Sequence, residues 1–319
     1  MRRWLPSFMV MIFIIFLVGC IDHKDIPRIK KVGMLIEGSI DDHSWNQRGY
    51  EGLLGLSEQY QVDIYYKEHI QTKNQVIQAV DEFVQNGVYL IFGHSNIYGR
   101  FFVQIAKEYP QVQFVYFNGS YFDENVTSLN FNAHAMGFFS GMVAAKMTKN
   151  NHVGVIAAHE WQPEIEGFYE GVKFQDSQIK VHINYTNSWH NYESALAIYE
   201  QMKGNQVDVF YPVSEYFSEE IIRQATKDNS YAIGYVIDQS HIDQNNVLTS
   251  TVQHIDKLYI HIAEKYNEGQ LKGGYFSFDF HDDLISLSHF SNEVPLSFQK
   301  TLVNYINQYR ETNLLPHEY

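Results

Sequence analysis

Residues 32–36, Val-Gly-Met-Leu-Ile, form a short and uninterrupted apolar run, and helical periodicity follows from Gly49 to Tyr60. A short apolar run of this kind is typical of a strand that is buried on both faces of a sheet. The pair of a buried strand and a following helix is the unit that recurs along the 319 residues. This stretch therefore decides the fold class.

The alternation of strands and helices continues to the C-terminus. Further strands are predicted at residues 63–66, 89–92, 113–117, 127–131, 152–157, 179–185, 207–211, 231–235 and 247–252. Further helices are predicted at residues 98–109, 133–147, 163–174, 191–204, 218–228, 256–267 and 297–309. One more helix is predicted between Thr72, which forms a capping box with Gln75, and Gly87.

Strands that alternate with helices of 10–15 residues predict parallel sheets with helices on both faces. About ten strands are too many for one sheet of ordinary size. We therefore predict an α/β fold with two lobes. No long linker separates the halves of the sequence, so several short crossovers are expected to join them.

The composition limits the classes of partner. The chain has 23 lysines and arginines against 37 aspartates and glutamates, and its formal charge is −14. An acidic balance disfavours binding to the phosphate backbone of nucleic acids, so no nucleic-acid partner is expected. The single cysteine excludes a disulfide framework and a cysteine-rich zinc site.

The sequence carries no motif for a cofactor or a catalytic metal. Gly-x-Gly-x-x-Gly, Gly-Lys-Ser/Thr and His-Glu-x-x-His are all absent from it. Carboxylate pairs at residues 41–42 and 282–283 could in principle do acid–base work. Nothing in the sequence supplies a nucleophile or an oxyanion site beside them. We expect neither an enzyme nor a bound metal or cofactor.

The N-terminus has the pattern of a secretory signal. Arg2 and Arg3 precede the apolar residues 8–18, and the run ends in Leu-Val-Gly-Cys at residues 17–20. This pattern resembles the bacterial lipoprotein signal, in which the cysteine is acylated and becomes the mature N-terminus. The resemblance implies removal of residues 1–19, a lipid on Cys20, a tether over residues 20–31 and an outward-facing position at the cell membrane. An uncleaved anchor with an incidental cysteine is the alternative.

Polar and aromatic residues follow the predicted strands in both halves of the chain. In open α/β sheets, ligands bind at the carboxyl ends of the strands. The segments in these positions are residues 38–47, 93–96, 118–120, 159–162, 212–217 and 238–240. They could stack a planar ring and hold hydroxyl groups on carboxylates. Loops at strand ends are often polar without any ligand, and the pattern alone does not separate these two interpretations.

Residues 41–47, Asp-Asp-His-Ser-Trp-Asn-Gln, together with Gly49 and Gly52, resemble the signature of the basic membrane lipoprotein (BMP) family. Members of this family are lipid-anchored substrate-binding proteins of ABC importers, and characterised members bind purine nucleosides. Residues 93–94, 161–164 and 238–240 resemble the Med branch of the family, which is described as regulating competence. Further segments that carry the resemblance are residues 136–145, 153–156, 167–171, 231–235 and 247–250.

The resemblance implies the fold of a type I periplasmic binding protein. Such a protein has two Rossmann-like lobes, three crossovers and a cleft between the lobes. On this basis lobe 1 is expected to contain residues 32–127 and 254–279. Lobe 2 is expected to contain residues 128–253 and 280–319.

The family's ligand contacts imply particular residues for a nucleoside base. Asp42 and Asn46 would bind the polar edge of the base. Trp45 stands where the family has phenylalanine and would provide one stacking face. Either Tyr216 or Phe217 could provide the other face.

The remaining ligand-binding residues implied by the resemblance are Asp238, for ribose hydroxyls, with His94 and Trp161. Gln253 stands where the family usually has lysine, and residues 212–216, Pro-Val-Ser-Glu-Tyr, replace a glycine-rich turn. These departures leave three possibilities open, namely a nucleoside-like ligand, a different small ligand, or no ligand.

Three functions from different classes follow. The first is the ligand-binding subunit of an importer, with an ABC permease as partner. The second is a Med-type regulatory lipoprotein that acts as a positive regulator of competence, with altered or absent ligand binding. The third is cytoplasmic action on DNA, against which the acidic charge and the export signal both argue.

Overall fold

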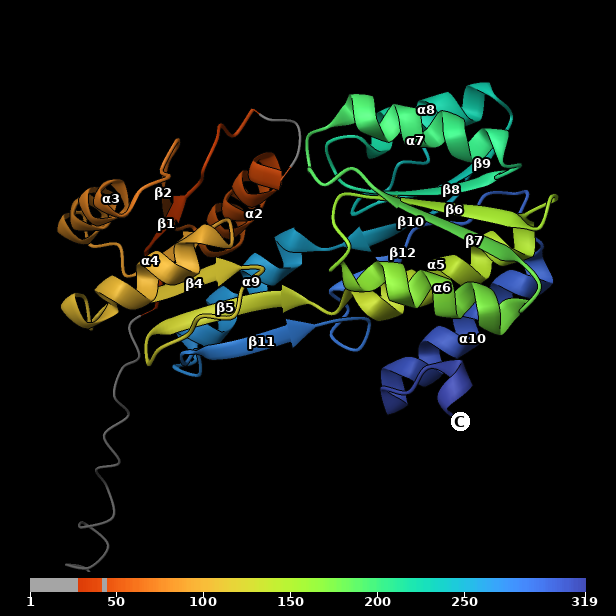
Figure 1. Cartoon of the computed structure of the whole chain (residues 1–319). Coiled ribbons are helices and arrows are strands. Elements are labelled where there is room, and N and C mark those ends of the chain that lie inside the picture. The colour runs from red at the N-terminus through yellow and green to blue at the C-terminus, as the bar shows by residue number, and fades with distance from the viewer. Residues whose placement is uncertain (1–27, 42–44) are drawn as a thin grey trace, which may run out of the picture.

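Two lobes, each built on a six-stranded sheet, make up the part of the chain that the computed structural model describes, residues 28–41 and 45–319 (Figure 1). The predicted signal, Cys20, most of the predicted tether and Asp42 lie outside these residues. Each sheet is covered by helices on both faces (Figure 1). The predicted two-lobed α/β architecture is therefore confirmed.

The sheet of lobe 1 has the strand order β11-β5-β4-β3-β1-β2 and is parallel throughout. Its strands are β1 (Lys31–Leu35), β2 (Asp63–Lys67), β3 (Leu90–Gly93), β4 (Gln113–Phe117), β5 (Val126–Phe131) and β11 (Gly274–Phe278). Its helices are α2 (Trp45–Tyr60), α3 (Lys73–Gln85), α4 (Ile97–Ile105), the 3₁₀ turn η1 (Ala106–Glu108) and α9 (Ile255–Asn267).

The sheet of lobe 2 has the order β12-β10-β9-β8-β6-β7, and only the pairing of β12 with β10 is antiparallel among its described strands. Its strands are β6 (His152–Ala157), β7 (Lys180–Tyr185), β8 (Val209–Val213), β9 (Tyr231–Gly234), β10 (Val247–Gln253) and β12 (Ile285–Leu287). Its helices are α5 (Ala133–Met147), α6 (Pro163–Gln175), α7 (Tyr192–Gly204), α8 (Ser218–Lys227), α10 (Leu296–Thr312) and the 3₁₀ turn η2 (Pro316–Glu318).

The predicted strands and helices are all present, most of them within two residues of their expected ends. The capping box of Thr72 and Gln75 is confirmed at the start of α3. One local prediction is wrong, because residues 212 and 213 extend β8 instead of beginning the turn. The pairing of β8 with β9 stops at Phe210, before Pro212, which has no N–H group to donate to a neighbouring strand.

Three crossovers connect the lobes, at Asn132, His254 and Asp279. The backbone N–H of Asn132 donates to Phe278 O at 2.8 Å, and the amide of its side chain donates to Asp279 Oδ2 at 3.4 Å. The first and third crossovers are therefore bonded to each other. The backbone N–H of His254 donates to Leu284 O at 2.9 Å, which ties the second crossover to the third.

The expected boundary after residue 127 falls inside β5. That strand pairs with β11 from Thr127 to Phe131, so residues 128–131 belong to lobe 1 and not to lobe 2. The crossovers at His254 and Asp279 lie within a residue of the other two expected boundaries.

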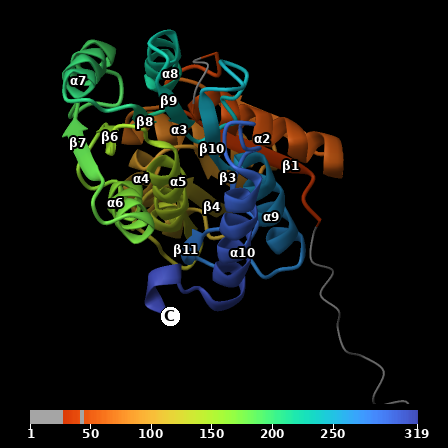
Figure 2. The same ribbon diagram turned by 90° about the vertical axis from the view of Figure 1, so that its right-hand side faces the viewer.

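In lobe 2, α5 and α6 pack backbone against backbone (Figure 2). Four glycines make this possible. A Cβ atom on Gly167 would lie 1.9 Å from His134 O, and one on Gly171 would lie 1.9 Å from Phe138 O. Gly137 and Gly141 of α5 face α6 backbone oxygens in the same way, at 2.0 and 2.2 Å.

In lobe 1, α2 and α9 pack through a ring instead (Figure 2). A Cβ atom on Gly52 of α2 would lie 2.8 Å from the ring of Tyr259 on α9. Tyr259 is fully buried and stacks on Phe92 of β3, with ring centroids 4.3 Å apart. Aromatic side chains therefore fill the space that glycines close in lobe 2.

None of the helices within residues 28–41 and 45–319 combines the length and the apolar character that crossing a bilayer requires.

Candidate functional site

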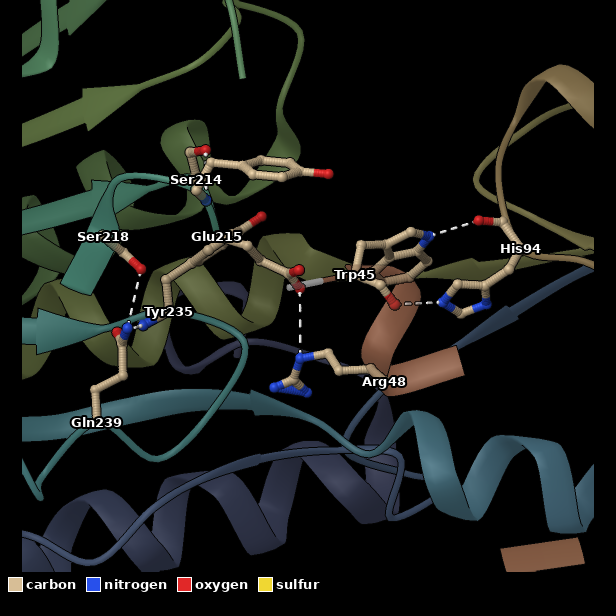
Figure 3. Close-up of polar contacts among 9 residues, drawn as sticks. Trp45, Arg48, His94, Ser214, Glu215, Ser218, Tyr235 and Gln239 are labelled. Atoms are coloured by element: carbon tan, nitrogen blue, oxygen red, sulfur yellow. Dashed lines mark hydrogen bonds and ion pairs between the residues drawn. The ribbon is translucent and has the colours of Figure 1, made fainter. Parts of the chain in front are cut away.

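Residues from both lobes face one another where the strands of the two sheets end (Figure 3). Lobe 1 contributes Trp45 and Arg48 from the first turn of α2, with His94 directly after β3. Lobe 2 contributes Glu215, in the loop after β8. We call this set of four residues the interlobe site.

Trp45 and His94 contact each other through two hydrogen bonds and through stacking of their rings. The indole Nε1–H donates to His94 O at 2.8 Å, and His94 Nε2 lies 2.8 Å from Trp45 O. The two rings stack with centroids 4.5 Å apart and an angle of 16°. Figure 3 shows His94 on the side of Trp45 that is remote from the labelled lobe-2 residues. The indole is therefore a fixed platform, supported from behind.

The hydrogen bonds of His94 define its tautomer. Trp45 O can only accept, so Nε2 carries the proton and donates it to that oxygen. Nδ1 is then the acceptor for the hydroxyl of Tyr259, at 3.0 Å. His94 is fully buried, and this desolvation lowers its pKa to about 3, so the ring is neutral at physiological pH.

Two neighbours leave little freedom to the His94 ring. A Cβ atom on Gly49 would lie 2.6 Å from His94 Cδ2, so any larger residue on this turn of α2 would displace the imidazole. Phe117, the last residue of β4, packs edge-on against both His94 and Trp45, at 4.8 and 5.8 Å. The platform is therefore enclosed by glycine on one side and by an aromatic edge on another.

An ion pair links the two lobes across the interlobe site. Arg48 Nε lies 3.9 Å from Glu215 Oε1, and the side chains are 17% and 13% exposed (Figure 3). Burial on both sides shields the pair from salt more than a surface pair would be. The pair therefore joins two lobes through residues that are far apart in the sequence.

Behind Glu215, lobe 2 contains a buried carboxyl group. Glu164, in the first turn of α6, accepts a hydrogen bond from the Tyr235 hydroxyl at 2.7 Å and one from Gln162 Nε2 at 3.1 Å, both at Oε1. Burial raises the pKa of Glu164 despite these donors. Burial, and then the neighbouring Glu164, raise the pKa of the Tyr235 hydroxyl, which remains a donor.

The backbone around Tyr235 is held by Gln239. Gln239 Oε1 accepts from Tyr235 N at 2.9 Å, and Gln239 Nε2 donates to Ser218 Oγ at 3.0 Å (Figure 3). Its own backbone N–H donates to Ser250 Oγ at 3.0 Å. These bonds join β9, β10 and α8 into one unit, so the lobe-2 side of the site is also preorganised.

The structure places the predicted lobe-1 residues as follows. Trp45 and His94 come together, although His94 is a buried support and not a surface contact. Asn46 is buried in α2, and the Cβ position at Gly38 lies 3.0 Å from its Nδ2. Asp42 lies outside the described residues.

Among the predicted lobe-2 residues, Tyr216 and Phe217 have opposite environments. Tyr216 is 40% exposed, and its ring centroid lies 3.7 Å from that of His190. Phe217 is fully buried in the hydrophobic core of lobe 2, against Ile221 and Ile222. The option of Phe217 as a stacking face is therefore wrong, and Tyr216 is the ring that the solvent reaches.

The other predicted residues are spread over lobe 2. Asp238 is exposed, and its Oδ1 accepts from Ser240 N at 3.0 Å. Gln253 is buried at the end of β10, one residue before the second crossover. Trp161 is 65% exposed and makes its ring contacts with His159 and Trp189, both in lobe 2.

The sequence prediction omitted Arg48, Glu215, Glu164 and Tyr259. Arg48 lies one residue before the glycine-containing part of the family signature, and Glu215 lies in the segment that replaces the family's glycine-rich turn. Their positions in the sequence were the only features that could have identified Arg48 and Glu215 as candidate site residues. Glu164 and Tyr259 had none, because helical periodicity does not distinguish a buried polar group from a core residue.

Across residues 28–41 and 45–319, no group of three or more histidine, cysteine or acidic side chains is arranged to hold a metal ion.

Comparison with known proteins gives a family and a fold. The profile of the Bmp family, described as ABC transporter substrate-binding protein PnrA-like, matches residues 29–316. The chain is 42% identical to the transcriptional activator protein Med of Bacillus subtilis, over 97% of this chain and 98% of that protein. It is 22% identical to basic membrane protein A2 of Borrelia garinii, over 86% and 85% of the two chains.

Solved structures agree with this relationship. A transcriptional activator of the comK gene from Bacillus halodurans superimposes with a TM-score of 0.86 at 39% identity, over 90% of this chain and 100% of that one. An ABC transporter solute-binding protein from Aeropyrum pernix superimposes with a TM-score of 0.69 at 20% identity, over 91% and 82% of the two chains. The predicted periplasmic-binding-protein fold and the similarity to Med are both confirmed, and the chain belongs to the PnrA-like Bmp family of ABC transporter substrate-binding proteins.

Proposed function

We propose that this protein is a lipid-anchored, extracytoplasmic binding protein that holds a nucleoside-like ligand between its lobes. The observation that carries the proposal is the platform of Trp45 on His94, a rigid aromatic surface facing lobe 2. Stacking of a base on an aromatic side chain contributes roughly 1–3 kcal/mol. Because hydrogen bonding and stacking already fix the indole, little of this energy is lost in ordering it.

The lobe-2 side supplies complementary groups for such a ligand. Tyr216 provides an exposed ring and Asp238 an exposed carboxylate, and the latter suits ribose hydroxyls. A hydrogen bond to a charged group contributes roughly 1.5–3 kcal/mol. Closure of the lobes about the three crossovers would bring these groups onto the ligand.

Lipidation of Cys20 would hold the protein on the outer face of the cell membrane, where an ABC permease is the expected partner. A Cys20→Ser variant should lose membrane retention and the lipid-dependent mobility of the wild-type protein. Unchanged retention and mobility would contradict the proposed anchor while leaving ligand binding open.

Calorimetry tests the ligand directly. Residues 21–319, which contain every element of the fold, should bind at least one purine nucleoside with a Kd in the micromolar range. Trp45→Ala should weaken that binding at least about fivefold, which corresponds to the lower end of a stacking contribution. Trp161→Ala is the comparison variant. The resemblance also implies Trp161 as a ligand contact, but its ring contacts are with His159 and Trp189 and not with Trp45, so its loss should be smaller than that of Trp45→Ala.

Absence of heat with millimolar nucleosides would rule out this ligand class. Equal losses with the two tryptophan variants would contradict the placement of the base on Trp45.

A second function, regulation of competence without transport, is favoured by two observations. Identity to Med is 42%, against 22% to the Borrelia protein. In addition, Glu215 stands where the family has a glycine-rich turn, and it joins the lobes through Arg48 at 3.9 Å. In this function the ion pair, and not a ligand, sets the balance between separated and closed lobes.

Charge reversal distinguishes the two functions. Arg48→Glu and Glu215→Arg should each increase the radius of gyration in small-angle scattering of the ligand-free protein, and the double variant should restore it. A radius that responds only to an added nucleoside would favour the transport function. Transformation frequency in a strain that carries each variant then reports whether lobe closure matters for competence.

A further inference from the structure

A hollow on lobe 2 is lined by residues of α6, of the loop that precedes it and of the edge strand β7. Figures 1 and 2 show where α6 and β7 lie on this lobe. Its volume is about 470 Å³. Three of its aromatic side chains reach the solvent, since Trp161 is 65%, Tyr169 45% and Tyr185 36% exposed. Exposed aromatic rings that gather around one concave surface make it a candidate binding surface.

The Trp161 ring is held in place from behind. It stacks on His159 with centroids 5.3 Å apart and an angle of 10°, and Trp189 meets it edge-on at 5.9 Å. His159 is fixed in turn by its backbone N–H, which donates to Gln162 Oε1 at 2.8 Å. The contacts with His159 and Trp189 therefore restrict the Trp161 side chain, although most of its surface is exposed to solvent.

The hollow is lined by two acidic side chains, and its lining residues include no lysine or arginine. Glu160 and Glu166 line it, both are exposed, and neither forms an ion pair with any residue that the structure describes. The N-terminus of α6 offsets only about half a unit charge. The two carboxylates therefore make the hollow attractive to a cation.

One exposed ring of the hollow, that of Tyr169, already has a cation over its face. Lys173 Nζ lies 5.6 Å from the centroid of the Tyr169 ring. The same ammonium group also donates to Ser177 O and Ile179 O, at 3.1 and 2.6 Å. Tyr169 is therefore paired with Lys173, whereas no lysine or arginine of the described residues lies over the rings of Trp161 and Tyr185.

We propose that this hollow binds a small organic cation, of the quaternary ammonium or alkylated amine class, between Trp161 and Tyr185. Aromatic faces attract such cations through the ring quadrupole, most strongly on tryptophan. Glu160 and Glu166 supply the neutralising charge without the strict geometry that a metal ion needs. None of the four residues of the interlobe site lines the hollow, and the proposal does not depend on the function proposed above.

Choline and 3,3-dimethylbutan-1-ol form a matched pair of probes, because they differ in one quaternary nitrogen that becomes carbon. Titration of residues 21–319 should show saturable choline binding with a Kd below about 10 mM. The neutral alcohol should bind at least about tenfold more weakly, because it lacks the cation–π attraction and the carboxylate attraction. Equal binding of the two probes, or no saturable choline binding, would overturn the proposal.

Variants then place the binding in the hollow. Trp161→Ala should weaken choline binding at least about fivefold, and the double variant Glu160→Gln/Glu166→Gln should weaken it about threefold and flatten its salt dependence. Trp45→Ala should leave choline binding unchanged. Loss of choline binding in Trp45→Ala with retention in Trp161→Ala would assign the cation to the interlobe site and overturn the proposal.

Failure of this proposal is distinguishable from failure of the nucleoside proposal. The two ligands are measured separately on the same three proteins, namely the wild type, Trp45→Ala and Trp161→Ala. Circular dichroism spectra and melting temperatures, measured for each variant, show whether a loss of binding is local or follows from unfolding.

Discussion

The α5–α6 pair of lobe 2 and the α2–α9 pair of lobe 1 occupy corresponding places but are packed by different means. In lobe 2 four glycines bring backbone onto backbone, with Cβ positions about 2 Å from carbonyl oxygens. In lobe 1 a glycine faces the ring of Tyr259, and that ring continues to His94 and the Trp45 platform. The α5–α6 pair is therefore held by direct backbone contacts, whereas the α2–α9 pair contributes a side chain that supports the site.

The two helix pairs therefore have different roles. The α5–α6 pair fixes the spacing of two helices, whereas the α2–α9 pair also supports the Trp45 platform. Backbone contacts tolerate no change of spacing, because interiors are close-packed and strain is transmitted. A ring between two helices is also tightly packed, but its hydroxyl can carry a specific hydrogen bond to the site. In lobe 1, the α2–α9 pair is therefore linked to the site by the hydrogen bond between the Tyr259 hydroxyl and His94 Nδ1.

The largest expected effect comes from adding a methyl group to the glycine-packed pair. Gly171→Ala places Cβ 1.9 Å from Phe138 O, so the helices must separate. We expect a loss of about 3 kcal/mol or more in the free energy of unfolding. Gly52→Ala, which meets a side-chain ring at 2.8 Å, should cost about 1–2 kcal/mol. Urea unfolding of the two variants measures both, and equal costs would remove the contrast between the helix pairs.

The second largest expected effect is a loss of stability at low pH that comes from His94. Because the pKa of His94 falls from 6.5 to about 3 on folding, the unfolded state binds more protons between these values. Stability should therefore fall by about 1.4 kcal/mol per pH unit as the pH drops below 6.5, from this residue alone. Above pH 6.5 the residue should contribute no slope.

His94→Gln removes this term and isolates it from the other titrating groups. The difference in unfolding free energy between pH 7 and pH 4.5 should be smaller in the variant by about 2–3 kcal/mol. Identical pH profiles for the two proteins would show that the imidazole is not the buried neutral group described here.

A smaller effect is expected from the hydroxyl that joins α9 to the platform. Tyr259→Phe leaves the buried Nδ1 of His94 without its donor, at a cost of about 1–3 kcal/mol. It should also weaken binding at the Trp45 platform. Tyr266→Phe on the same helix is the control, because its hydroxyl makes no hydrogen bond to any other described residue. If the two variants lost the same stability and the same binding affinity, the proposed support of the site by α9 would be contradicted.

The smallest effect is a gain. Gly55 of α2 has no atom within 4 Å of its Cβ position, so Gly55→Ala adds helix propensity without a clash. We expect a stabilisation of about 0.5–1 kcal/mol. A loss of stability would mean that α2 is packed as tightly as the glycine-rich pair of lobe 2.

Much of the fold was predictable from the sequence because its central strands are buried on both faces. Apolar runs such as residues 90–93 and 113–117 have few alternatives. β11 escaped prediction because it is an edge strand, and neighbouring residues Tyr275 and Phe276 are both exposed, so its pattern does not alternate. β12 has three residues, which are too few to show a period.

The site was predictable only in part. The family signature pointed to Trp45, but the partner of Arg48 comes from the other lobe, and no local pattern encodes that pairing. Tyr216 and Phe217 show the same limit, since adjacent aromatic residues after a strand give no sign of which one enters the core. The environment of a loop residue depends on the element that follows it, here α8.

The three crossovers have a consequence for how the protein is made. Residues 28–131 supply five of the six strands of lobe 1, but the sixth strand, and the helix that carries Tyr259, come from beyond residue 254. During synthesis from the N-terminus, the tryptophan surface therefore precedes by about 200 residues the hydroxyl that orients its support. A chain cut short before α9 would contain the whole sequence signature and still lack the Tyr259 hydroxyl that orients His94, so we expect such a chain not to bind at the platform.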